Sequence, residues 1–247
     1  MTLMARMRCG MVAVLVCAAG LQAGDRKDKP KPAGAQMVDS GSFGVFVKGQ
    51  RVVTETFSVQ QDNGVSIVKS QLKETGGSAG QKSSLQMTGS GELVRYEWSD
   101  GSGALVVTPN NEFLLEKITT ASSSKPAEKP FLMPSTAVIL DNNFFVHRQV
   151  LAWRYLATNC RTESGTQKCQ QGALDFAVLV PQDQTSMSVR MELVGREKIS
   201  IRGTERELLR LNLKGEAFNW ALWVDDKDQF KLMRVLIADD NTEVVRD

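Results

Sequence analysis

Residues 43–59 read FGVFVKGQRVVTETFSV, which is two alternating runs on either side of Lys48-Gly49-Gln50. Apolar side chains recur with a period of two, at Phe43, Val45, Val47, Val53, Phe57 and Val59. A period of two places these side chains on one face of an extended strand, and a glycine between two such runs is typical of a hairpin turn. The stretch therefore predicts a β-hairpin with one buried face.

The same alternation continues along the chain, so the sequence predicts a single, mainly β domain over residues 42–247. Further strands are expected at 65–72, 85–87, 93–98, 105–108, 113–118, 176–180, 187–194, 199–201, 209–213, 218–224 and 231–237. Roughly a dozen strands with short turns favour an antiparallel meander, and a sheet of that size curls or closes. We expect a strongly curved antiparallel sheet or half-barrel with one central helix in its hollow.

That helix is predicted over residues 142–157, after a proline-bearing crossing at 121–136. Asp141 or Asn142 can cap its first turn, since a side-chain oxygen there accepts a backbone N–H. Its apolar side chains recur at helical spacing: Phe144, Val146, Val150, Leu151, Trp153 and Tyr155. They cover more than half the circumference and predict burial against the sheet, with Arg148 on the remaining polar strip. Trp153→Ala is therefore expected to lower stability sharply and Arg148→Ala hardly at all.

Residues 1–23 have the order of a secretory signal peptide. Arg6 and Arg8 precede the apolar run 11–19, and cleavage is expected after Ala23. Residues 24–41 are charged, proline-bearing and aperiodic, which predicts a polar linker. We expect an exported protein, periplasmic or secreted. Val16 before Cys17 is a poor match to a lipoprotein signal and disfavours lipid anchoring through that cysteine.

Removal of the signal leaves equal numbers of basic and acidic side chains, because it takes two arginines from 30 basic and no acid from 28 acidic residues. A neutral chain with interspersed signs lacks the basic stripe of a nucleic-acid-binding protein. The apolar run of the signal is too short to span a membrane, and no span is expected in the mature chain. Cys160 and Cys169 are then the remaining cysteines, and in an exported chain they predict a disulfide. Their spacing does not fit a cysteine-ligated metal site.

Several short segments resemble a family of uncharacterised exported bacterial β-proteins, known as a domain of unknown function. They are 45–49 (VFVKG) with Thr54-Glu55, 140–145 (LDNNFF), 180–182 (VPQ), 222–225 (LWVD) and the closing Val245-Arg246. The resemblance implies an envelope location and a curved sheet loosely similar to periplasmic lipoprotein carriers. It brings no catalytic residues with it.

Two motifs resemble catalytic serine sites, and neither has the required context. Residues 76–80 (GGSAG) match a nucleophile elbow, which needs a strand before the serine and a helix after it, but both flanks alternate like strands. Ser-x-x-Lys occurs at 66–69 and at 122–125. The first copy lies in a predicted strand, where residues three apart point to opposite faces, and the second lies in the proline-bearing crossing.

Other candidate groups also lack partners in the sequence. His147 is the single histidine, and we expect it on the polar face of the helix or partly packed. The acids Glu92, Glu97, Asp225 and Asp226 are available, but no spacing selects a pair of them. Asp225, Asp226 and Asp228 lack the glycine and closing glutamate of a calcium loop and predict a solvated turn. We therefore nominate no catalytic, cofactor-binding or metal-binding residue and expect no enzyme activity.

Three hypotheses about function follow. The first is a non-catalytic binding module whose hollow holds a lipid or another apolar or amphipathic ligand. Its candidate wall residues are Trp98, Trp153, Trp220 and Trp223. The second is a structural or interaction protein of the cell envelope, partnered by another envelope protein, whose hollow is filled by its own helix. The third is a carboxylate-dependent hydrolase.

Overall fold

The computed structural model describes residues 34–247 apart from 78, 124 and 164–165. The expected signal peptide and Cys17 lie outside the described residues, as does most of the expected linker. Residues 36–41 of that linker belong instead to the first strand, because their backbone continues the pairing with the second strand, from Gln36 opposite Gln61 onward. Backbone pairing of this kind does not require alternating side chains, which is why the sequence pattern missed it.

Fifteen strands of the described residues form one open sheet, which confirms the mainly β fold. In chain order they are β1 (Gln36–Val47), β2 (Gln50–Asp62), β3 (Val65–Glu74), β4 (Ala79–Thr88), β5 (Leu93–Ser99), β6 (Gly103–Asn110), β7 (Phe113–Thr120), β8 (Ala127–Phe131), β9 (Val138–Ile139), β12 (Ala173–Val180), β13 (Thr185–Ile201), β14 (Thr204–Lys214), β15 (Asn219–Asp225), β16 (Lys231–Ile237) and β17 (Thr242–Arg246). Their spatial order is β8-β7-β6-β5-β4-β3-β2-β1-β17-β16-β15-β14-β13-β12-β9.

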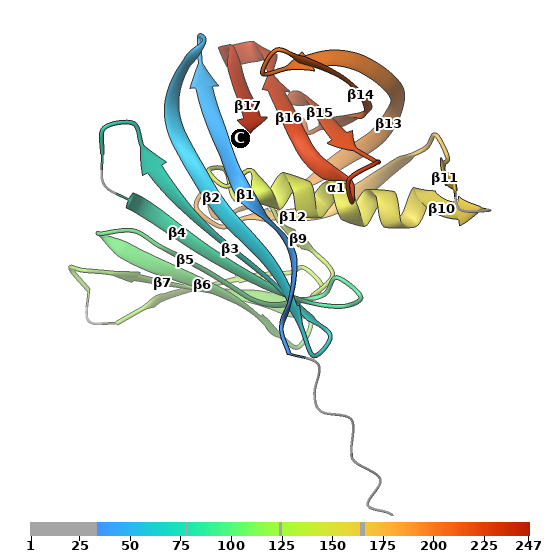
Figure 1. The fold of residues 1–247 in the computed structure, drawn as a ribbon. Coiled ribbons are helices and arrows are strands. Elements are labelled where there is room, and N and C mark those ends of the chain that lie inside the picture. Colours follow the sequence, from blue (N-terminus) through green and yellow to red (C-terminus); the bar gives the residue numbers. More distant parts are fainter. Residues whose placement is uncertain (1–33, 78, 124, 164–165) are drawn as a thin grey trace, which may run out of the picture. The chain divides into compact units, whose positions relative to one another are not determined.

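The sheet consists of two antiparallel meanders joined edge to edge by β1 and β17, whose register pairs Phe43 with Arg246 and Val47 with Thr242. Figure 1 shows the β1–β7 strands in blue to green and the β13–β17 strands in orange to red, with the sheet curving between them. One pairing departs from the expected antiparallel meander. β9 lies parallel to β12, with Val138 beside Val178. The sheet is therefore mixed.

The predicted helix is confirmed, and it begins later than expected. α1 spans Val146–Asn159, and a single turn of 3-10 helix, η1 (Ala238–Asp240), precedes β17. Asp141 and Asn142 do not cap α1, because the backbone between them and Val146 is not helical. Asp141 Oδ1 instead accepts the backbone N–H of Asn143 at 2.8 Å. The cap comes from β2, where the two carboxylate oxygens of Glu55 accept Phe145 N–H at 2.6 Å and Val146 N–H at 3.1 Å.

α1 packs on the concave side of the sheet, between the two meanders (Figure 1). Its buried side chains join one hydrophobic core with residues of both meanders, among them Phe43, Phe57, Val68, Leu85, Val189, Leu211, Leu222 and Val235. A helix of this length is marginal alone, so burial against the sheet supplies its stability. The gap between α1 and the β4–β5 strands holds about 10 Å³, which is scarcely room for one water molecule.

A second, smaller apolar cluster lies on the face of the sheet opposite to α1, and β13, β14, β15 and β16 contribute to it. It contains Ile199, Ile201, Leu208, Trp223 and Met233. A register shift between Leu193 and Gly195 reverses the alternation along β13, so Leu193 faces α1 whereas Ile199 and Ile201 face away from it. The bulge explains how one strand contributes to two cores.

Arg148 contradicts the prediction that it lies on an exposed polar strip. Its side chain is fully buried, at 0 % exposure, with its guanidinium over the rings of Phe145 at 5.1 Å and Trp220 at 5.0 Å. It donates hydrogen bonds to the backbone carbonyls of Asp141 and Phe144, the second at 2.8 Å. The cause is the late start of α1, which leaves these carbonyls turned toward Arg148. The premise of the Arg148→Ala prediction, an exposed side chain, is therefore wrong. Trp153 is half-buried and donates its indole N–H to Phe230 O at 2.8 Å.

The predicted disulfide is confirmed. Cys160 and Cys169 face each other across the two-stranded hairpin of β10 (Cys160–Glu163) and β11 (Thr166–Cys169), which directly follows α1. No helix within 34–247, the masked positions aside, is both long and apolar enough to cross a membrane.

Candidate functional site

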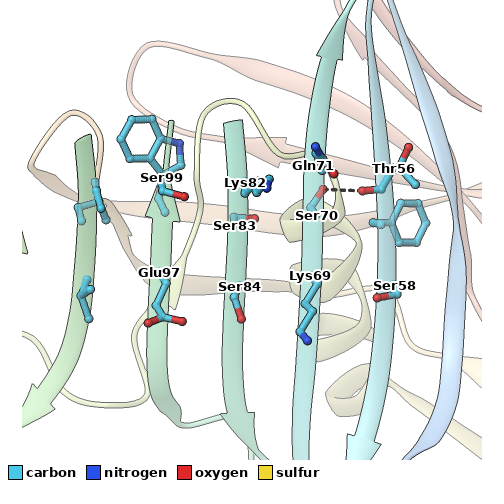
Figure 2. Close-up of a pocket in the computed structure, with 15 residues that line it drawn as sticks. Thr56, Ser58, Lys69, Ser70, Gln71, Lys82, Ser83, Ser84, Glu97 and Ser99 are labelled. Atoms are coloured by element: carbon cyan, nitrogen blue, oxygen red, sulfur yellow. Dashed lines mark hydrogen bonds between the residues drawn. The ribbon is translucent and has the colours of Figure 1, made fainter. Parts of the chain in front are cut away.

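A groove of about 660 Å³ lies on the face of the sheet turned away from α1. Figure 2 shows its strands in front of α1. All of its lining residues come from five neighbouring strands: Thr56, Phe57 and Ser58 of β2, Lys69, Ser70 and Gln71 of β3, Lys82, Ser83 and Ser84 of β4, Glu97, Trp98 and Ser99 of β5, and Ala104, Leu105 and Val106 of β6. We refer to it as the outer groove.

Small side chains alternate with long ones across the strands of the outer groove. Ser58 lies opposite Lys69, Lys69 opposite Ser84, and Ser84 opposite Glu97 in the strand register. Serine, threonine and alanine leave the backbone near the surface, and the rotation of strand direction from β2 to β6 bends it into a saddle (Figure 1). Period-two alternation sends Phe57, Ser70 and Ser83 to the buried face, so they contribute backbone rather than side-chain tips.

The outer groove carries more positive than negative charge. Lys69 and Lys82 are exposed and form no ion pair with any carboxylate in the described part of the chain. Glu97, the acid of this groove, is neutralised by Arg95, whose guanidinium nitrogen lies 2.7 Å from the carboxylate. Thr56, Ser58, Ser84 and Ser99 line the same groove, and their hydroxyl groups offer hydrogen-bond donors to an anion.

A second hollow, of about 400 Å³, lies beside the C-terminal half of α1. Its lining is mainly apolar and consists of Val38, Trp153, Leu156, Ala157, Cys160, Gln229 and Phe230. Val38 is itself exposed, as is Met37 next to it. We refer to this hollow as the apolar groove.

The four tryptophans proposed as ligand-wall residues are not brought to one site. Trp153 lines the apolar groove, and Trp98 lies along the outer groove with its indole N–H donated to Gln81 at 3.2 Å. Trp220 packs on Phe218 and under the guanidinium of Arg148. Trp223 belongs to the second apolar cluster, between Arg210 and Arg234. Alternation explains the separation of the last two, because residues three apart on β15 face opposite sides.

His147 is fully buried, at 0 % exposure, rather than on a polar helix face. Its Nδ1 accepts the backbone N–H of Asp141 at 3.2 Å, and its Nε2 has no partner among the described residues. Burial, and then the charge of Arg148, lower the pKa of His147 to about 3. The imidazole is therefore neutral at ordinary pH and sealed from substrate, so it serves the packing of α1.

A buried polar cluster surrounds His147 and was not foreseen. The Asp141 carboxylate accepts hydrogen bonds from the Tyr96 hydroxyl and the Gln182 amide. Burial raises the pKa of Asp141, against the effect of these donors. Burial lowers the pKa of Arg148 to about 10, so Arg148 remains charged at neutral pH. The cluster joins β5, α1 and the turn after β12.

Two buried carboxylates, Glu55 and Glu116, were also missed. Burial raises the pKa of each to about 7. Glu55 accepts hydrogen bonds from the α1 N-terminus and from Ser70 Oγ at 2.7 Å, whereas neither oxygen of Glu116 has a partner among the described residues. The alternation in the sequence could have identified both glutamates as buried. Glu55 occupies an inward position between Val53 and Phe57, and Glu116 occupies one between Leu114 and Ile118.

The acids considered from the sequence lie apart. Glu97 is on β5, and Glu92 is in the turn before it, where its backbone N–H is donated to Thr88 Oγ1. Asp225 and Asp226 lie at the end of β15, paired with Arg206 and Arg196. Asp228 pairs with Lys231 at 2.8 Å. The described residues contain no group of three or more His, Cys, Asp or Glu arranged for a metal ion.

The two serine motifs also lack a catalytic setting. Residues 76–80 run from the turn after β3 into the start of β4, so a strand rather than a helix follows the turn, and Ser78 is outside the described residues. Ser66 and Lys69 lie on β3, and the second Ser-x-x-Lys lies between β7 and β8.

Comparisons of the chain with protein-family models, with curated proteins and with solved structures find no match.

Proposed function

We propose that this protein is a non-catalytic binding module, in which the helix-filled sheet is a rigid scaffold and the outer groove receives the ligand. The observation that carries the proposal is the groove itself. It is a hollow of about 660 Å³ with hydroxyl and ammonium groups directed into it. This volume lies in the range typical of ligand sites.

The packing of α1 supports a site on the exterior rather than in the hollow of the sheet. Phe144, Leu151 and Tyr155 are fully buried against both meanders, where a lipid would have to lie. For the inside of the molecule, this arrangement favours the hypothesis that the protein's own helix fills the hollow. The burial of His147, with a neutral imidazole, supports a non-catalytic role.

Export is part of the same proposal. The Cys160–Cys169 disulfide supports it, because disulfides persist in oxidising compartments and are rare in the cytosol. An extracytoplasmic module would meet polymers and partners of the cell envelope.

The outer groove can be tested by obstruction. Ser84→Trp places an indole in its centre, and Thr119→Trp places one on the same face of β7, outside the groove. The wild-type protein and both variants are screened by thermal shift and glycan array against neutral glycans, acidic glycans and phospholipid vesicles. We expect at least one ligand to bind the wild type and Thr119→Trp but not Ser84→Trp. Ligand binding that Ser84→Trp leaves intact, or a screen with no ligand, contradicts the proposal.

The apolar groove favours a second candidate function, which is binding of an amphipathic ligand. Trp153, Leu156 and Phe230 supply an apolar surface, and exposed Met37 and Val38 extend it. Organic extraction of the purified protein followed by mass spectrometry tests this candidate. Lipid should co-purify with the wild type and be lost in Ala157→Trp, which fills the groove. A lipid-free extract from wild-type protein contradicts it.

A further inference from the structure

We infer that the ligand of the outer groove is an acidic polysaccharide, that is, a glycan chain bearing carboxylate groups. The inference rests on the proposed function, since it names the ligand class of that same groove. It is carried by the placement of Lys69 and Lys82, by the hydroxyl groups that line the same groove and by the absence of aromatic side chains from the outward-facing positions.

Lys69 and Lys82 form a positively charged pair on neighbouring strands. In the register of β3 and β4, Lys69 lies opposite Ser84 and Gln71 lies opposite Lys82, so the two lysines are diagonal neighbours on one face. Diagonal neighbours across a strand pair have Cα atoms roughly 7–8 Å apart. Both side chains carry a positive charge, so an anion placed between them is attracted by two ammonium groups. A carboxylate is therefore attracted to the centre of the groove.

The groups beside the lysines suit a polyhydroxylated chain. Thr56, Ser58, Ser84 and Ser99 each offer a hydroxyl that both donates and accepts, and Gln71 offers an amide. The groove crosses five strands, from β2 to β6. At about 4.8 Å between neighbouring strands, its length is roughly 19 Å. An extended chain of several sugar units fits this length better than a single small anion does.

The same surface disfavours other polymers. Strand alternation directs outward the side chains of Thr56, Ser58, Lys69, Gln71, Lys82, Ser84, Glu97, Ser99, Ala104 and Val106, none of which is aromatic. Single-stranded nucleic acids bind through aromatic stacking platforms combined with a basic groove. Phe57 is buried, and Trp98 lies opposite the inward Ser83 and packs against the hydrophobic core, so neither supplies an outward platform. Charge complementarity without stacking favours an acidic glycan.

The test uses polygalacturonate as the acidic glycan, dextran as the neutral one and oligo(dT) as the nucleic acid. Binding to the folded protein is measured by isothermal titration calorimetry at two salt concentrations. We expect polygalacturonate to bind and its affinity to fall at least tenfold in the double variant Lys69→Gln/Lys82→Gln. Lys117→Gln is the matched control, because Lys117 lies on β7 outside the groove and is paired with Glu128 at 2.8 Å.

The possible outcomes distinguish an error in the ligand class from an error in the binding site. Loss of polygalacturonate binding in the double variant, with Lys117→Gln unchanged and equal thermal midpoints, supports the inference. Equal losses in both variants, or oligo(dT) binding at least as tight, overturn it. Dextran binding that Ser84→Trp abolishes and the lysine variants preserve overturns the acidic class but leaves the outer groove as the site. If Ser84→Trp abolishes the binding of none of these ligands, both proposals are wrong.

Discussion

Arg148 is the largest side chain that the core of this protein encloses completely. Two backbone carbonyls accept hydrogen bonds from its guanidinium. Burial lowers the pKa of Arg148, and the nearby carboxylates of Asp141 and Glu55 act in the opposite direction and raise it. Rings of Phe145 and Trp220 cover the two sides of the guanidinium. A buried cation of this kind requires every one of these partners, since leaving a buried charge or polar group unpaired costs several kcal/mol.

Arg148→Ala should therefore lower the free energy of unfolding by about 3–5 kcal/mol, because it leaves buried carbonyls and carboxylates without their partner. The control is Arg190→Ala, since Arg190 is exposed and its ion pair with Asp175 spans 3.6 Å. That change should cost less than about 1 kcal/mol. Denaturant titration measures both, with an unchanged slope as the sign of two-state unfolding. Equal, small effects would show that Arg148 is not enclosed in solution.

At the residue scale, the sequence predicted apolar burial well and polar burial poorly. Phe144, Leu151 and Tyr155 are in the core as their spacing indicated. Arg148 was expected on a polar strip, and His147 on the polar face of the helix or partly packed, because helical periodicity treats polar side chains as exposed. Their burial depends on carbonyls that the irregular segment before α1 leaves free, and periodicity carries no information about such groups.

At the scale of elements, α1 depends on a cap that comes from a distant strand. Glu55 is 0 % exposed and accepts two backbone N–H groups of the first turn, which have no partner inside a helix. Glu55→Ala should destabilise the protein by about 2–4 kcal/mol, since it leaves two buried donors unsatisfied. Ser70→Ala, which removes one hydrogen bond to the same carboxylate, should cost about 1 kcal/mol. Hydrogen exchange at Phe145 and Val146 provides the local measurement, and unchanged protection in Glu55→Ala would contradict the cap.

The β10–β11 hairpin is an appendage closed by the Cys160–Cys169 disulfide. The bond closes a loop with a sequence separation of 9, for which chain entropy gives roughly 2–3 kcal/mol. Reduction should thus lower the unfolding midpoint without unfolding the sheet, because β10 and β11 pair with each other and not with the sheet. Alkylation before and after reductant, followed by intact-mass measurement, counts the free thiols. Two reactive thiols in untreated protein would show that the bond is absent.

Sequence patterns located most elements of the sheet and could not give their ends or their partners. The start of α1 was placed at Asp141 or Asn142 because local capping rules consider neighbouring residues only, whereas Glu55 is 91 positions from Val146. The parallel pairing of β9 with β12 was missed because β9 has two residues, too few to show alternation. Both omissions concern contacts between residues far apart in the chain.

At the scale of the whole described unit, the pairing of the first strand with the last strand joins the two meanders. Arg246 of β17 binds Asp39 of β1 through two hydrogen bonds, at 2.6 and 3.1 Å, and Gln149 of α1 joins the same pair. The curved sheet around one helix was predictable, because a dozen alternating strands must curl. The outer groove was not, since it depends on which small residues of five strands fall into register.

Buried carboxylates make the stability of this unit depend on pH. The pKa values of Glu55 and Glu116 are raised by burial from 4.5 to about 7. Between these values the folded chain keeps protons that the unfolded chain releases, so the free energy of unfolding falls as pH rises. The stabilisation is complete below about pH 4.5 and lost through about pH 7. For Glu116, whose oxygens have no partner among the described residues, we expect a loss of about 1–3 kcal/mol.

Glu116→Gln should remove that part of the pH dependence, because an amide of the same size does not ionise. Denaturant titrations at pH 5, 6, 7 and 8 should show a smaller decline in the variant than in the wild type, with the two curves diverging most above about pH 7. Glu112→Gln is the matched control, since Glu112 is exposed in the turn between β6 and β7 and should leave the curve unchanged. A wild-type stability that rises over this interval, or a variant that declines as steeply, would mean that Glu116 reaches water or a partner, and the inner face of β7 would then be accessible.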